Sequence, residues 1–191
     1  MAPSRRWELG VRVTAAAEEE SALLLRCPAA EPAVGAWRAR LDLAAAVGVP
    51  AHVTVTYPFA AVDRLSPSDH ALLERLFGVV PSFALVGERT AWFGDTVLYV
   101  ELTGAAAVAG LTDAVTTAFP TYPPYGGAYA EVVPHLTVGD DHDRSALRAA
   151  EDAVRDHLPF TQVVTQVELW SGPPPVSRRG RWRVVRAYPL G

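Results

Sequence analysis

Two stretches of sequence decide the fold: AHVTVTYPF at 51–59 and VPHLTVGD at 133–140. Each contains a histidine followed two positions later by a threonine, with apolar residues between and after them. Successive side chains of a β-strand point to opposite faces, so residues i and i+2 share a face. If each stretch is a strand, its imidazole and its hydroxyl lie side by side on one surface, and the alternate apolar residues anchor the other surface in the core. The four polar residues are His52, Thr54, His135 and Thr137.

Two such strands facing one another would gather two imidazoles and two hydroxyls around one small site. The unperturbed pKa of histidine is about 6.5, so at neutral pH one ring can accept a proton while the other donates one. Threonine hydroxyls can donate to the non-bridging oxygens of a phosphate, where negative charge develops in the transition state. This set of groups suits phosphodiester chemistry at a ribose, and none of these steps requires a metal or a cofactor.

A single His-x-Thr pattern carries little weight, because a strand histidine beside a threonine is usually a half-buried polar pair. The doubling of the pattern, in matching places of two similar halves, favours a functional site. A zinc site would need a third ligand, but the other histidines fall in predicted helices or a polar loop without H-E-x-x-H spacing, so we expect no metal. These other histidines are His70, His142 and His157. The single cysteine, Cys27, lies in an apolar run and is interpreted as a small core residue.

Strand and helix patterns alternate along the rest of the chain. We expect strands at 21–27, 51–58, 82–86, 96–102, 131–138, 162–170 and 181–188, and helices at 31–43, 66–77, 105–119 and 145–158. The two motif histidines are 83 residues apart (135 − 52), and each half of the chain repeats one plan. The sequence therefore predicts an α+β fold with two related lobes in a single domain, 21–191, preceded by an N-terminal extension, 1–20.

The composition of the 191-residue chain is that of an ordinary globular protein, with a formal net charge of −4. An acidic total argues against a protein that coats long nucleic acid by charge, but it is compatible with a small phosphorylated ligand or one RNA end. The longest apolar runs are too short to span a membrane, and the first residues lack the apolar segment of a signal peptide. We therefore expect a cytoplasmic protein, which we take to be a monomer.

The two motifs resemble those of the two-histidine (2H) phosphoesterase superfamily, which includes 2′-5′ RNA ligase-like proteins and cyclic nucleotide phosphodiesterases. The family mark is His-x-Thr/Ser-x with a hydrophobic final position, and it stands intact at 52–55 and 135–138. The resemblance implies a bilobal, pseudo-twofold fold with antiparallel sheets lining a central cleft and helices outside. It also implies metal-independent action on a 2′,3′-cyclic phosphate or a 2′-5′ phosphodiester of a nucleotide or RNA end. The histidines would then form the acid/base pair, and the threonines would bind the phosphate.

Further residues are candidates for binding the rest of a substrate. Aromatic side chains that could stack on a base are Tyr57, Trp92, Phe93 and Tyr125, and Tyr125 is favoured because it lies in a Pro/Gly-rich loop just before the second motif. Arg181 and Arg183 would share a face if they lie on a strand, and could contact a phosphate or a base, although such residues are more often solvated charges at a strand edge. The alternative to an enzyme is a non-catalytic module of the same fold that binds a nucleotide or an RNA end.

Overall fold

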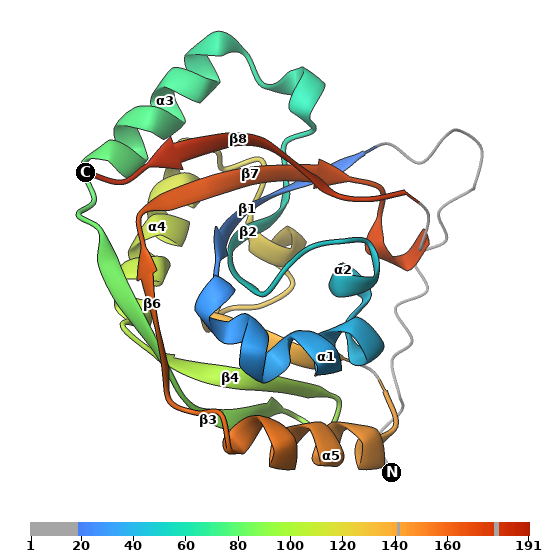
Figure 1. Cartoon of the computed structure of the whole chain (residues 1–191). Coiled ribbons are helices and arrows are strands. Elements are labelled where there is room, and N and C mark those ends of the chain that lie inside the picture. The colour runs from blue at the N-terminus through green and yellow to red at the C-terminus, as the bar shows by residue number, and fades with distance from the viewer. Residues whose placement is uncertain (1–18, 141, 178–179) are drawn as a thin grey trace.

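The computed structural model describes residues 19–140, 142–177 and 180–191 (Figure 1). The predicted N-terminal extension, 1–20, lies outside the described residues except for its last two. Two four-stranded antiparallel sheets form the frame, with strand orders β2-β1-β7-β8 and β5-β4-β3-β6. The first sheet consists of β1 (Glu20–Arg26), β2 (His52–Phe59), β7 (Gln166–Gly172) and β8 (Arg183–Pro189). The second consists of β3 (Phe83–Phe93), β4 (Val97–Thr103), β5 (His135–Asp140) and β6 (Phe160–Val164).

In the part of the chain that the structure describes, five α-helices accompany the sheets. They are α1 (Glu31–Leu41), α2 (Leu43–Ala46), α3 (Pro67–Gly78), α4 (Ala105–Ala118) and α5 (Arg144–Arg155). The helix starts follow from side-chain chemistry: Ser66 and Asp69 form a capping box at the start of α3, and Asp143 accepts the amide hydrogen of Ser145 at the start of α5. Among the described residues, no helix is both long and apolar enough to cross a membrane.

The predicted α+β class with two antiparallel lobes is confirmed, but the lobes are not successive halves of the chain. The last two strands return to the first sheet, where β7 pairs with β1 and β8 pairs with β7. Figure 1 shows β6 running up the left side from the lower sheet, and β7 continuing into the upper one. The strand predicted at 162–170 is therefore two strands on different sheets, which a single residue, Thr165, separates. Because no glycine or proline lies at the break between β6 and β7, the sequence pattern predicted a single strand.

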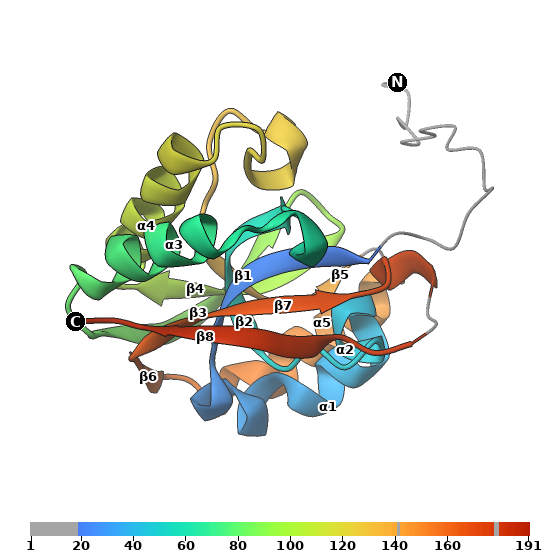
Figure 2. The same ribbon diagram turned by 90° about the horizontal axis from the view of Figure 1, so that it is seen from above.

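The two motif strands occupy equivalent positions, as the edge strands of their sheets that lie next to each other. Strands β2 and β5 are in contact without being hydrogen bonded to one another. Helix α1, which follows β1, packs against β5, and α4, which follows β4, packs against β2. Each lobe thus supplies the helix that supports the motif strand of the other lobe. Figure 2, viewed from above, shows α3 and α4 to one side of the strands and α1 and α5 to the other.

One apolar cluster links the lobes beneath the motifs. It includes buried residues of the first sheet, such as Leu25 and Val53, and of the second sheet, such as Val100 and Leu136. Fully burying a leucine or valine side chain contributes about 1.5–3 kcal/mol. The motif strands are therefore held from below by the same core, which restricts their relative movement.

Both motif strands carry a β-bulge at the fourth position of the motif. In the first sheet Leu24 pairs with Thr54 and Leu23 with Thr56, so Val55 is the extra residue. In the second sheet Val138 is extra in the same way. Bulges bend a strand, increase its twist and re-aim nearby side chains. The hydrophobic fourth position of the motif is thus a buried bulge residue directly after the threonine.

Candidate active site

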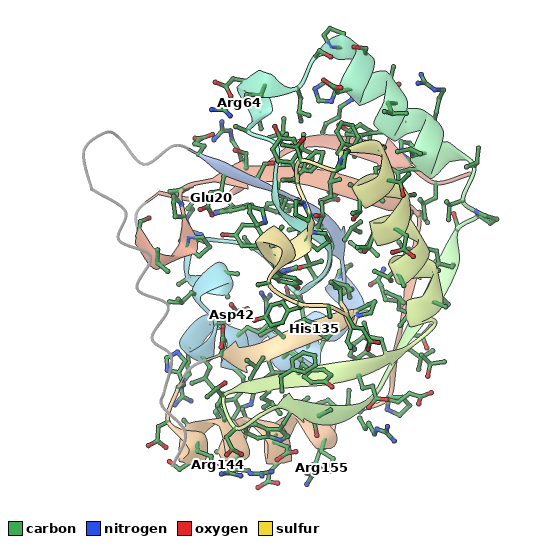
Figure 3. The ribbon with its side chains drawn as sticks, turned by 180° about the vertical axis from the view of Figure 1, so that it is seen from behind. Glu20, Asp42, Arg64, His135, Arg144 and Arg155 are labelled. Atoms are coloured by element: carbon green, nitrogen blue, oxygen red, sulfur yellow. The ribbon has the colours of Figure 1, made fainter. Side chains whose placement is uncertain are left out.

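The structure brings the two predicted motifs together on neighbouring strands. Along β2 the side chains of His52 and Thr54 are partly exposed while Val53 and Val55 are buried, and β5 repeats the alternation with His135 and Thr137 partly exposed. We call the sheet surface that carries these four side chains the motif face. Figure 3 shows His135 near the middle of the molecule, whereas Arg144 and Arg155 lie on α5 at its outer edge.

Both histidines are held by the same backbone contact. His52 Nδ1 lies 2.8 Å from the carbonyl oxygen of Pro50, and His135 Nδ1 lies 2.7 Å from that of Val133. A carbonyl oxygen can only accept, so Nδ1 carries the hydrogen in each ring. In the neutral rings the lone pair is then on Nε2. Each imidazole can accept a proton at Nε2 when neutral and can donate one from Nε2 when protonated.

The surroundings lower the pKa of both rings, because burial disfavours the charged imidazolium. Burial, followed by the positive charge of Arg38, lowers the pKa of His52 to about 4. Burial also lowers the pKa of His135, while its bond to the Val133 carbonyl acts in the opposite direction. The charge on His135 is itself among the causes that lower the pKa of His52, so the two rings are close enough to influence each other's protonation.

A buried ion pair lies behind the first motif. Arg38 on α1 is 2% exposed, and its Nε and Nη2 both donate to Oδ2 of Asp42, at 3.0 and 2.7 Å. Arg38 Nη1 also lies 3.4 Å from the carbonyl oxygen of Val49, just before β2. Asp42 in turn accepts the amide hydrogen of Ala44 and so caps α2. The pair fixes the segment that leads into His52 and places a positive charge near the ring.

Tyr125 is the predicted binding residue that reaches the motifs. Its phenol lies beside Thr54: burial raises the pKa of Tyr125, and the Thr54 hydroxyl acts in the opposite direction. The segment that carries it lies against β2 and contains three successive residues with positive φ: Tyr125 at 52°, Gly126 at 62° and Gly127 at 76°. Left-handed backbone costs a non-glycine residue about 1–2 kcal/mol. Such strain persists where surrounding structure imposes it, and here it sets the tyrosine against Thr54.

Tyr57 is on β2, two residues past the bulge, but its hydroxyl is directed to another partner. The Tyr57 hydroxyl donates to the carboxylate of Glu20, and its ring centroid is 6.1 Å from that of Trp182. Burial, followed by the bond to Glu20, raises the pKa of Tyr57. Tyr57 therefore lies on the motif strand as predicted, but its hydroxyl is hydrogen bonded to Glu20 and does not point to the motif histidine and threonine.

The two arginines do not share a strand face as expected. Strand β8 begins at Arg183, and Arg181 precedes it. Arg183 forms two hydrogen bonds to the carboxylate of Glu19, at 3.0 and 3.1 Å, and lines a cavity of about 460 Å³ with Arg64. This strand is at the opposite edge of the sheet from β2. The Arg181 guanidinium lies against Gly48, in the segment before the first motif.

Two charged residues that strand pairing places on the motif face were not predicted from the sequence. Arg26 pairs in register with His52, and Glu101 pairs with His135. Paired residues of antiparallel strands point to the same side, so each histidine has a charged neighbour, and the two neighbours have opposite charge. Phe93, one of the aromatic candidates, lies beside His135. Trp92 is on the other side of β3, where its indole donates to Glu151.

No three histidine, cysteine, aspartate or glutamate side chains of the described residues lie close enough together to bind a metal ion. Cys27 is buried, as expected of a small core residue, and burial raises its pKa to about 12. A thiol with such a pKa stays protonated at neutral pH and is a poor nucleophile. The titratable groups on the motif face whose pKa burial shifts include the two histidines, Tyr125 and Tyr99.

Comparison with known proteins adds a family and a fold. Residues 26–172 match the family model described as the 2'-5' RNA ligase superfamily. Among solved structures, E. coli LigT with 3'-AMP is 19% identical, with 91% of this chain and 98% of that chain covered and a TM-score of 0.51. A phosphoesterase is 19% identical (90% and 98% covered, TM-score 0.53). The protein TT0787 of Thermus thermophilus is 17% identical (90% and 97% covered, TM-score 0.55). No curated protein matches the chain significantly.

The structural likeness, at these identities, establishes the fold, and the family model covers most of the chain. It spans both motif strands and the bulges that follow their threonines. The resemblance to the 2H phosphoesterase superfamily is therefore confirmed at the level of family and fold: this chain belongs to the 2'-5' RNA ligase superfamily.

Proposed function

We propose that the chain is a metal-independent phosphodiesterase or RNA ligase-like enzyme that acts on a 2′,3′-cyclic phosphate or a 2′-5′ phosphodiester. The observation that carries this proposal is the matched pair of imidazoles, both held through Nδ1 so that both Nε2 atoms are available for proton transfer. Two proton carriers suit in-line displacement at phosphorus, in which the nucleophile loses a proton and the leaving oxygen gains one. Binding alone would require only hydrogen-bond donors.

The proposed hydrolytic step balances in the following way. One neutral imidazole, at His52 or His135, takes a proton from water at Nε2 as the water oxygen bonds to phosphorus. The bond from phosphorus to one ribose oxygen breaks, and the other imidazole, whose protonated form the negative charge of the bound phosphate favours against the effect of burial, gives its Nε2 proton to that oxygen. Thr54 and Thr137 donate to the non-bridging oxygens, where charge accumulates. When a ribose 5′-hydroxyl of a second RNA end takes the place of water, the same two proton transfers open the cyclic phosphate and join the two ends; the ring P–O bond that breaks takes the place of an energy-rich cofactor.

Tyr125 is proposed as a positioning residue for Thr54. A hydroxyl has one hydrogen and two lone pairs, so when a bound phosphate takes the hydrogen of Thr54, the phenol of Tyr125 can donate to a lone pair of the same threonine. Hydrogen-bonded chains of this kind polarise one another and strengthen both bonds. The left-handed backbone at Tyr125 keeps the phenol against Thr54 before a substrate arrives, which lowers the ordering cost on binding.

The ligand class is proposed from the site and supported by relatives. E. coli LigT has been crystallised with 3'-AMP and with NADP+, both nucleotides. The net charge of −4 disfavours long RNA as the ligand, and the bidentate pairing of Arg183 with Glu19 leaves that arginine engaged. A small cyclic nucleotide or one RNA terminus is the proposed substrate. We also propose that residues 21–191 act as one domain, as a cytoplasmic monomer, with Arg181 and Tyr57 as peripheral contacts to the substrate.

The test is turnover of 2′,3′-cyclic mononucleotides and of short RNAs with 2′,3′-cyclic ends, in the presence of EDTA. We expect wild-type turnover, and a loss of at least about 100-fold in His52→Ala and in His135→Ala, since general acid–base catalysis contributes about 10²–10⁴-fold. His157→Ala, which removes an exposed histidine after α5, is the control and should keep the wild-type rate.

Three results would contradict the proposal in different ways. Activity that EDTA abolishes would refute the metal-free mechanism. Full activity in both alanine variants would refute the assignment of the acid/base pair. Tight binding of the cyclic nucleotides without any turnover would favour the second candidate, a non-catalytic nucleotide- or RNA-end-binding module.

A further inference from the structure

Three aromatic rings meet beside the second motif. The ring centroids of Phe93 and Tyr99 are 4.1 Å apart with an interplanar angle of 19°, so the two rings are stacked. His135 meets both rings edge to face, with centroids 4.9 Å from Phe93 and 5.4 Å from Tyr99. These distances are within the range of favourable aromatic pairs. The catalytic imidazole proposed above is therefore in direct contact with a pair of stacked rings.

Strand pairing explains why these rings lie on the motif face. Tyr99 on β4 pairs with Thr137 on β5, and Ala91 on β3 pairs with Tyr99, so these residues point to one side. Phe93 is two residues after Ala91 on β3 and points to the same side. The neighbouring Trp92 points to the opposite side, against Glu151.

The two rings are not explained by core packing. Two clusters of apolar side chains form the interior of the described structure, and neither includes Phe93 or Tyr99. Tyr99 is 8% exposed, with Phe93 stacked on its ring, while Phe93 itself remains partly exposed. A phenylalanine laid flat on a tyrosine at the surface, next to a proposed catalytic residue, presents a flat apolar area to whatever occupies the motif face.

We propose that Phe93, backed by Tyr99, is a platform on which the base of a nucleoside cyclic phosphate stacks, on the His135 side of the site. A base and its 2′,3′-cyclic phosphate are separated by one ribose, so a base platform must lie within one sugar of the reacting phosphate. Phe93 meets this condition, because its ring contacts the imidazole of His135. The two lobes then have different roles. The second sheet, with Phe93 and His135, binds the nucleoside, and the first sheet, with Arg26 beside His52, faces the phosphate side of the substrate.

The rim of the platform carries charge that could contact the edge of a base. Glu101, the cross-strand neighbour of His135, accepts two hydrogen bonds from Arg89, at 2.8 and 2.9 Å. This pair is exposed and lies in the same row of the sheet as His135. Stacking itself is tolerant of base identity, because every base has a π-face. The platform therefore predicts that substrates with a base are preferred to substrates without one, and that purines are preferred to pyrimidines by their larger area.

The experiment compares adenosine 2′,3′-cyclic phosphate with ribose 2′,3′-cyclic phosphate, which lacks the base. For the wild type we expect a ratio of kcat/KM in favour of the nucleoside of about 5- to 150-fold, since each stacked base contributes about 1–3 kcal/mol. Phe93→Leu keeps an apolar side chain but removes the π-face, so most of this ratio should disappear through KM. Phe93→Tyr should retain the ratio.

Phe83→Leu is the matched control, because Phe83 is on the same strand but packs against the main apolar cluster. It should leave the ratio unchanged, and thermal denaturation of all variants reports any loss of folding. The platform is refuted by a wild-type ratio near one, by an unchanged ratio in Phe93→Leu, or by an equal loss in Phe83→Leu.

This inference rests on the proposed function, so a second measurement separates the two. Binding of 3′-AMP and of ribose 3-phosphate, followed by calorimetry, needs no turnover. If neither cyclic phosphate is hydrolysed, the proposed activity fails, but tighter binding of 3′-AMP that Phe93→Leu alone removes still supports the platform. Equal binding of the two ligands to the wild type would refute it.

Discussion

Replacing Thr56 with valine should stabilise the protein, although the residue lies on the motif strand. Thr56 follows the bulge at Val55, faces the core and is 0% exposed. Its hydroxyl oxygen is buried and has no hydrogen-bond partner among the described residues. A buried polar group without a partner costs about 1–3 kcal/mol, and valine has the same shape without that group.

Thr112 offers a matched control with the opposite expectation. Its hydroxyl, on α4, donates to the carbonyl oxygen of the bulge residue Val55 at 2.8 Å. Thr112→Val would leave this buried carbonyl without that donor and should cost about 1–3 kcal/mol. Both substitutions replace a buried hydroxyl with a methyl group, at Thr112 and at the residue that follows its acceptor Val55, and they should change stability in opposite directions.

Urea unfolding followed by circular dichroism measures both changes, with thermal denaturation as a check. For a chain of this size, each 1 kcal/mol shifts Tm by about 2–4 °C. We expect Thr56→Val to raise Tm and Thr112→Val to lower it. A Thr56→Val variant that is destabilised as much as Thr112→Val would refute the reasoning, because it would mean that the Thr56 hydroxyl is satisfied in solution.

Three further predictions concern the site. Burial lowers the pKa of His52 from its ordinary value of about 6.5 to about 4. The stability that depends on the neutral ring is therefore complete above pH 6.5 and is lost as the pH falls through about 4. Over this range the Tm of the wild type should fall further than the Tm of His52→Asn. Tyr125→Phe, which removes the bond to Thr54, should lower kcat about 5- to 10-fold with little change in KM, whereas Tyr129→Phe should not; equal effects would argue against positioning. Arg38→Met leaves the carboxylate of Asp42 buried without its arginine and should cost about 3–5 kcal/mol of unfolding free energy, much of which the added change Asp42→Asn should restore; a harmless single change would show that water reaches Asp42.

The motif strands could be predicted because their information is local. A period of two over a few residues places His52 with Thr54 and His135 with Thr137, and the structure has these pairs on the expected faces. The strand expected at 131–138 begins only at His135, since the preceding residues form a loop that carries the histidine's acceptor carbonyl at Val133. Boundaries of this kind depend on contacts outside the segment.

Cross-strand neighbours could not be predicted, because they depend on register. Nothing local in the sequence indicates that Glu101 pairs with His135 or Arg26 with His52. The bulges at Val55 and Val138 also shift every later pair by one residue. The same limit explains Arg181 and Arg183: they share a face only if the strand includes both, and it begins at Arg183.

The interleaving of the sheets determines the order in which the site can assemble during synthesis. All strands of the second sheet, which carries His135, have been synthesised once β6 has left the ribosome, so this sheet can form before β7 and β8 are made. The first sheet, which carries His52, cannot be completed early. Strand β1 pairs with β2 on one side and with β7 on the other, and β7 and β8 are synthesised last. A nascent or truncated chain that stops before β7 would contain both motifs in full and still leave one edge of β1 unpaired. The presence of both motifs therefore does not indicate whether a fragment can assemble the site. The presence of the two C-terminal strands is the better criterion.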